Sequence, residues 1–284
     1  MAAQGQILPL KLALDEARRE FDADSENVFS EIKDSPAEAP AAARRLVESQ
    51  QGVIAVTLAM ARCDTIAIFS DWKRLIEHMI KASEGKSGYL AVFTVPHVLG
   101  GFLYMTAAIQ ALHHESWRVL ERLLNAKFEW YYSSGRPLYT YGFTLRYLFH
   151  PEALGRKASK THDLYRELLG QPAIQEITTL SGDDLLNTYV RAQLLMSLRA
   201  AQEVLKGNDA RIWADYGRFY SERVRPLFDR AHADPTFGQG IAAAFGETQE
   251  QFFANLNKRL GVIAKSFWQS GEYFWESLSS WEPR

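Results

Sequence analysis

The pair His113-His114, followed directly by Glu115, places three residues of metal-binding types next to one another. Adjacent side chains on a helix point about 100° apart, so the two imidazoles cannot both reach one ion. A helical zinc site would show histidines four residues apart, as in H-E-x-x-H, and the sequence has no such motif. We therefore predict a polar turn between two helices here, and neither a metal site nor a cofactor in the chain.

Arg156 and His162 are the second pair with chemical potential, separated by five residues. Their spacing resembles the R-x(4–6)-H motif of HEPN-type ribonucleases. That resemblance implies an arginine and a histidine that cut RNA without metal, usually at a dimer interface. Lys157 replaces the polar residue that the family carries directly after the arginine. Because spacing alone does not supply geometry, catalysis by Arg156 and His162 is an alternative rather than our first hypothesis.

The stretch 131–160 interleaves tyrosines with cations, and Glu152 is its one acidic residue. Tyrosine rings provide stacking surfaces and arginines provide forks for phosphate, so nucleic acid or a nucleotide could bind here. The alternative is an ordered loop whose tyrosines pack on the helices and whose cations pair with an acidic first helix. The ligand-binding or nucleic-acid-binding candidates are Tyr132, Arg136, Tyr139, Tyr141, Arg146, Lys157 and Lys160.

The sequence carries no P-loop, no G-x-G-x-x-G after a strand and no G-x-S-x-G elbow. Cys63 is its one cysteine, so no intramolecular disulfide can form, as is typical of cytoplasmic proteins. Cys63 follows an apolar helical run, where we expect a buried, inert thiol.

The C-terminal region is unusually aromatic. Such a segment either docks into the protein's own core or covers a partner, because Trp and Tyr dominate interface hot spots. The aromatic residues are Phe252, Phe253, Phe267, Trp268, Tyr273, Phe274, Trp275 and Trp281. As partner-interface candidates we take Phe267, Trp268, Phe274, Trp275 and Trp281.

The composition of the 284 residues is that of a folded protein, with 47% hydrophobic and 23% charged residues. The net charge of −2 provides no global attraction to nucleic acid or to an anionic membrane. The N-terminus lacks a basic region followed by an apolar core, so we expect no signal peptide and a cytoplasmic location.

Helical periodicity recurs along the chain and strand alternation is nearly absent, which predicts an all-α fold. We expect an irregular multi-helix bundle or a solenoid-like stack of antiparallel helix pairs. We expect the chain to divide into a helical block at 1–132, a basic, tyrosine-rich connection at 133–160 and a second helical block at 161–284. The two blocks are either two domains or parts of a single domain. The predicted helices are 9–33, 36–62, 71–82, 96–113, 115–132, 162–169, 181–206, 209–233 and 247–278.

Residues 87–114 contain no Asp, Glu, Lys or Arg, and 89–112 would be long enough to cross a bilayer. Pro96, His97 and the Gly100-Gly101 pair interrupt this stretch. We predict a helix that begins at Pro96 and lies in the centre of the fold, hydrophobic all round. A membrane span is the alternative.

The residues Gly101-Phe102-Leu103-Tyr104, then 107–109 and 117–124, resemble a helical hairpin in the accessory halves of large bacterial proteins. Some of those proteins act in phage defence and carry their effector domain elsewhere. The resemblance covers a small part of the chain and brings no catalytic motif. It implies a sensing or scaffolding component.

Three functional hypotheses follow. The first is a non-catalytic helical scaffold or sensor that binds a protein partner, or itself as a homo-oligomer, through its aromatic C-terminal helix. The second is a nucleic-acid-binding protein or a metal-independent, HEPN-like ribonuclease. The third is a membrane-associated helical protein.

Overall fold

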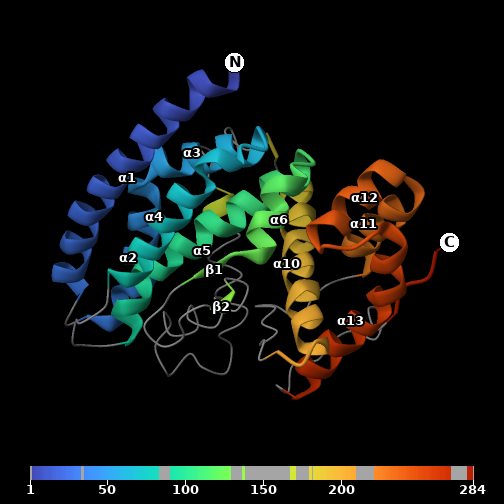
Figure 1. Cartoon of the computed structure of the whole chain (residues 1–284). Coiled ribbons are helices and arrows are strands. Elements are labelled where there is room, and N and C mark those ends of the chain that lie inside the picture. The colour runs from blue at the N-terminus through green and yellow to red at the C-terminus, as the bar shows by residue number, and fades with distance from the viewer. Residues whose placement is uncertain are drawn as a thin grey trace.

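The computed structural model describes residues 2–32, 35–82, 90–128, 136–137, 167–170, 179–180, 182–208, 221–269 and 280–283. Helices dominate these residues, which confirms the predicted all-α class (Figure 1). The helices of the first half are α1 (Ala2–Ile32), α2 (Ala39–Ser49), α3 (Gln51–Arg62), α4 (Phe69–Lys81), α5 (Leu90–His113) and α6 (Trp117–Asn125). Those of the second half are α10 (Gly182–Leu205), α11 (Ser221–Ala233), α12 (Pro235–Ala244) and α13 (Gln249–Gln269).

Helix α5 lies at the centre of this arrangement, in contact with α2, α3, α4, α6 and α10. Its stretch Thr94–His113 is long and apolar enough to cross a membrane, but 94% of the tested window is buried inside the protein. Burial among other helices explains the absence of charge, because every face of the helix meets apolar neighbours. The predicted core helix is confirmed.

Helix α5 nevertheless begins at Leu90, so the predicted start at Pro96 is wrong. Proline lacks only the N–H that would bond to residue 92, and the remaining helical hydrogen bonds can continue past it. Tertiary packing on several sides compensates for that one bond, and Val92, two residues after the start, is already buried. The sequence pattern around Pro96 cannot reveal this packing.

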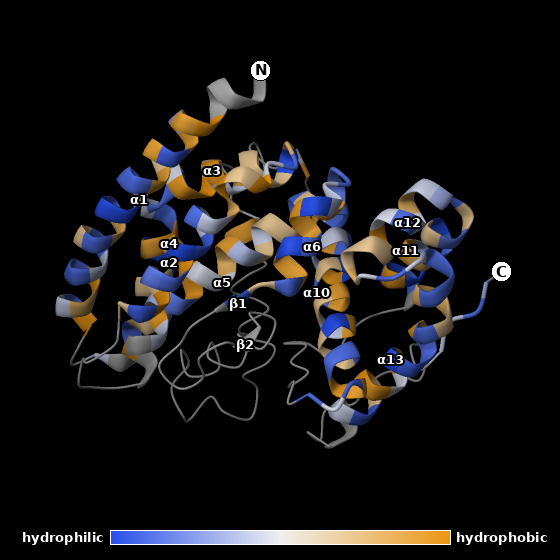
Figure 2. Cartoon of the chain, in the orientation of Figure 1, coloured by the Kyte–Doolittle hydropathy of each residue, from blue (hydrophilic) through white to orange (hydrophobic). Residues whose placement is uncertain are grey.

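Helix α1 runs along one side of the protein, with hydrophilic residues along its outer face (Figure 2). Its buried stripe contains Leu14, Ala17, Phe21 and Ile32, as the periodicity predicts. The helix begins at Ala2 rather than at Pro9, because the preceding residues include the strong helix formers Ala, Gln and Leu.

A break at Gln50 separates α2 from α3, so the predicted continuous helix 36–62 is wrong. Asp24, on α1, explains the break: its Oδ2 accepts hydrogen bonds from Ser49 Oγ at 2.7 Å and from Gln50 Nε2 at 2.8 Å. These bonds support Gln50 in a non-helical conformation, with φ −94° and ψ 41°. A short 3-10 helix at Pro36–Glu38 precedes α2.

Helices α5 and α6 form a hairpin whose turn is His114-Glu115, as predicted, with Glu115 at φ 56°. Asp64 fixes the start of α6, because its Oδ1 accepts the backbone N–H of Val119 at 2.8 Å. Helix α6 ends at Asn125 rather than at 132. Strand β1 (Lys127–Phe128) follows and pairs antiparallel with β2 (Arg136–Pro137), in the register Lys127 with Pro137.

In the second half, α10 has the predicted extent and ends before Gly207, whose φ of 81° suits glycine. Asp234 begins α12 by accepting the N–H groups of Thr236 and Phe237 at 3.0 and 3.1 Å. Helix α12 occupies most of the stretch between the predicted helices 209–233 and 247–278, where the sequence pattern predicts no helix. Of the predicted helices, 162–166, 209–220 and 270–278 lie outside the described residues.

Helices of the two halves touch directly. Helix α10 packs on α5, and α12 packs on α6. Gly240 of α12 makes this approach possible, because a Cβ there would lie 2.2 Å from the indole of Trp117. Buried residues from both halves belong to one hydrophobic cluster, which fixes α10 to α13 relative to α5.

Candidate functional site

Most of the residues that the sequence singles out for nucleic acid or catalysis lie outside the described part of the chain. This holds for Tyr132, Tyr139, Tyr141, Arg146, Arg156, Lys157, Lys160 and His162. Arg136 is described only through its backbone in β2. Nucleic-acid binding and RNA cleavage therefore remain predictions.

Of the five aromatic interface candidates, Trp281 is the one whose side chain is described, and it is 8% exposed. Its indole N–H donates to Asp229 Oδ1 at 3.0 Å. Its backbone N–H donates to Asn257 Oδ1 at 2.7 Å, and its carbonyl accepts from Asn257 Nδ2 at 3.1 Å. The indole also contacts the rings of Phe228, His232 and Phe253. Trp281 therefore anchors its segment on α11 and α13.

The side chains of the other interface candidates lie outside the described part of the protein. Phe267 and Trp268 are described only as backbone positions of α13. Phe274 and Trp275 lie outside the described residues. Phe252, earlier in α13, is fully buried and packs against Phe245 at a ring-centroid distance of 5.1 Å.

His113 is the last residue of α5 and His114 begins the turn, with their ring centroids 4.7 Å apart and the ring planes at 72°. The Nε atom of Arg62 lies 3.4 Å from His114 Nε2. Burial, with the neighbouring His113 and the Arg62 charge, holds the pKa of His114 below its usual value. Among the described residues no three His, Cys, Asp or Glu side chains are grouped to hold a metal ion.

Cys63 is exposed at the C-terminal end of α3, so the expectation of a buried thiol is wrong. The apolar run before it ends at Ala61, and Cys63 already belongs to the turn that leads to Asp64. The helix end, and not the local hydrophobicity, decides its exposure.

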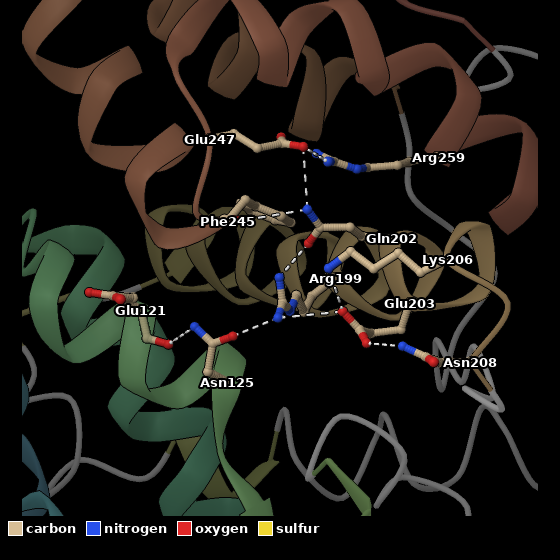
Figure 3. Close-up of polar contacts among 10 residues, drawn as sticks. All are labelled: Glu121, Asn125, Arg199, Gln202, Glu203, Lys206, Asn208, Phe245, Glu247 and Arg259. Carbon is tan, nitrogen blue, oxygen red and sulfur yellow. Dashed lines mark hydrogen bonds and ion pairs between the residues drawn. The ribbon is translucent and has the colours of Figure 1, made fainter.

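The most extensive described polar arrangement joins α6, α10, the turn before α13 and the middle of α13; we call it the α10 polar cluster (Figure 3). Its members are Asn125, Arg199, Gln202, Glu203, Lys206, Asn208, Glu247 and Arg259. Arg199 donates to Asn125 Oδ1 at 2.6 Å and to Gln202 Oε1, and it lies 3.4 Å from Glu203. This one side chain therefore connects α10 with α6.

Gln202 continues the cluster toward the C-terminal helices. Its Nε2 donates to the carbonyl of Phe245 and to Glu247 Oε1, each at 3.3 Å. Glu247 also pairs with Arg259 at 2.5 Å, where the two side chains are 13% and 1% exposed. Arg259 additionally lies over the rings of Phe245 and Phe252, at 5.1 and 5.6 Å. The faces of these rings therefore stabilise the positive charge of Arg259 together with the Glu247 carboxylate.

Glu203 stays ionised within this cluster. Burial alone would raise the pKa of its carboxyl, but hydrogen bonds from Lys206 and Asn208, with the charge of Arg199, outweigh burial and lower it. Each cation of the cluster has an acidic partner. The cluster therefore connects helices by ion pairs and hydrogen bonds, with Glu203 shared by Arg199 and Lys206.

Sequence reasoning did not find this cluster, because its members come from segments far apart in the chain. On α10 alone, Arg199 and Glu203 are four residues apart and indicate no more than an ordinary surface ion pair. Arg259 sits in an amphipathic helix, and no local signal marks it as buried.

Comparison with known proteins provides no relative for this arrangement: no family model, no curated protein and no solved structure matches the chain.

Proposed function

We propose that this chain is a non-catalytic helical scaffold or sensor that binds a protein partner, or a second copy of itself, through its aromatic C-terminal segment. The resemblance of its α5–α6 hairpin to accessory domains of bacterial proteins motivates the scaffolding role. The concentration of Phe and Trp after residue 266 motivates the choice of contact segment.

The anchoring of Trp281 is the observation that supports this proposal. Gln269 ends α13, and Trp281 is bonded back to Asn257 on the same helix. The described residues on either side of the segment with Phe274 and Trp275 are thus both held on the protein body. Attachment at both ends reduces the conformational entropy that a contact segment loses on binding.

The test compares the wild type with the double variant Phe274→Ser, Trp275→Ser by light scattering over a range of concentrations. We expect a wild-type mass above the 32.2 kDa of one chain, or a co-purifying protein, and loss of either in the variant. Trp281→Phe is the matched control, because it alters an aromatic that packs inside the chain, and it should keep the wild-type mass. A mass of one chain throughout, with the same co-purifying proteins for wild type and variant, contradicts the proposal.

A further inference from the structure

Arg191, in the middle of α10, has an unusual electrostatic position. Among the described arginines whose side chains are buried or half-buried, it alone has no carboxylate within 4.0 Å. The others each have one: Arg44 with Glu167, Arg199 with Glu203, Arg223 with Asp183, Arg225 with Asp229, and Arg259 with Glu247.

One nitrogen of Arg191 has a clear structural role. Its Nε donates to the backbone carbonyl of Arg223 on α11 at 2.8 Å. Arg223 lies in the first turn of α11, a helix that also contains Pro226 further along. Arg191 therefore connects α10 to the beginning of α11.

The terminal nitrogens of Arg191 are not used in this way. Within the described chain, Nη1 and Nη2 make no hydrogen bond, and neither is enclosed away from solvent. A guanidinium offers five N–H donors in a planar fork, so four of them remain free to bind a ligand. A partly desolvated cation with free donors favours an anionic ligand.

The surroundings of Arg191 carry charges of both signs. Arg223 is paired with Asp183 and Arg230 with Glu115 and Asp234, while the charge of Asp184 acts on Arg191 itself. Arg223 and Arg230 are seven residues apart on α11, so about two helical turns place them along the same side. Burial lowers the pKa of Arg191 below its usual value. The charge of Asp184 acts in the opposite direction, and the like charge of Arg230 lowers the pKa further. Asn187, one turn before Arg191 on α10, accepts a hydrogen bond from Arg223 Nη1 at 2.8 Å.

We propose that the α10–α11 junction is a binding site for a small oxyanion, a carboxylate or a phosphate group, held by the terminal nitrogens of Arg191. Asn187 and Arg223, which are hydrogen-bonded to each other, adjoin this site. The site is independent of the aromatic C-terminal segment and of the partner-binding function proposed above.

The test titrates inorganic phosphate, and separately acetate, into the full-length protein at constant ionic strength, measuring heat and melting temperature. Saturable binding of at least one anion is expected, with affinity reduced about tenfold or more in Arg191→Lys, which keeps the charge but lacks the planar fork. The anion that binds more tightly identifies the ligand group. Arg118→Lys, an exposed arginine of α6, is the matched control and should bind like the wild type.

A second variant keeps the test decisive if Arg191→Lys is poorly folded. Asn187→Asp places a carboxylate one helical turn from Arg191 and supplies the missing counter-ion internally. We expect this variant to melt at a higher temperature than the wild type without added anion, and to lose the response to phosphate and acetate. Absence of saturable binding by the wild type, or unchanged anion binding in either folded variant, overturns the proposal.

Discussion

Arg259 Nη2 lies 2.5 Å from Glu247 Oε1 in an ion pair that is almost closed to solvent. The pair joins the turn before α13 to the middle of that helix. Because Gln202 and Asn255 donate to the same carboxylate oxygen, Glu247 connects α10 with α13 as well.

Removal of one member of this pair leaves the other as a buried, unpaired charge. We predict that Glu247→Ala lowers the free energy of unfolding by about 3–5 kcal/mol. The double variant Glu247→Gln, Arg259→Met, which removes both charges, should recover much of that loss. Urea denaturation of the wild type and both variants measures the difference. A double variant as unstable as Glu247→Ala contradicts the assignment of a buried ion pair.

Trp281 provides a prediction about packing at the chain's end. Trp281→Ala removes an indole that contacts three rings and bonds to Asp229, so we expect a loss of about 3–5 kcal/mol. Trp281→Phe should lose less, because a ring remains against Phe253. Chemical denaturation compares the two. If both variants are as stable as the wild type, the indole does not anchor the segment.

His97 predicts an acid sensitivity of the fold. Burial lowers the pKa of its imidazole to about 3 from 6.5, although the hydrogen bond to the Ile80 backbone acts in the opposite direction. Between these two pH values the unfolded chain takes up a proton that the folded chain does not, so stability is lost as the pH falls below 6.5. The contribution of His97 reaches about 2 kcal/mol at pH 5.

The variant His97→Gln removes this titration. We expect its free energy of unfolding to change less between pH 7.5 and pH 5 than that of the wild type, in urea denaturation at both values. The free energy of unfolding of each protein at pH 7.5 is the baseline from which its change at pH 5 is measured. An identical pH dependence in the two proteins rules His97 out as the source of acid sensitivity.

The contact of Gly240 with Trp117 predicts a steric effect. A methyl group at 240 would overlap the indole, so Gly240→Ala should destabilise the protein by about 1–3 kcal/mol. The same substitution in a Trp117→Leu background should be much less harmful, because the smaller side chain leaves room. A double-mutant cycle without coupling would show that α12 does not approach α6 through this pair.

The ribonuclease hypothesis has its own experiment. Purified protein is incubated with single-stranded RNA beside the variants Arg156→Ala and His162→Ala. Cleavage that persists in the presence of EDTA and is lost in both variants is the outcome that hypothesis predicts. Equal cleavage by all three proteins, or none by the wild type, rejects it.

The features that follow from local pattern were predictable. The apolar run of α5, the buried stripe of α1 and the Gly207 end of α10 all depend on residues adjacent in sequence. The break at Gln50 was not predictable, because Asp24 of another helix supports it. The start of α5 was missed for the same reason, since packing by other helices, and not local signals, keeps the chain helical through Pro96.

The α10 polar cluster and the position of Arg191 could not be predicted either. A charged residue on an amphipathic helix is expected to face water, and only the arrangement of the helices shows where its partners lie. Arg191 and Arg259 both lie within long helices, yet Arg259 has a carboxylate at 2.5 Å and Arg191 has none within 4.0 Å in the described chain.

The central place of α5 also bears on the order of biosynthesis. Helices α2, α3 and α4 precede α5 in the chain and can cover it as soon as it leaves the ribosome, whereas α10 emerges much later. Until then, α10 cannot cover the apolar residues of α5 that it contacts in the folded protein. Nascent chains of this protein should therefore depend on chaperones or on slow translation between α6 and α10 to avoid aggregation.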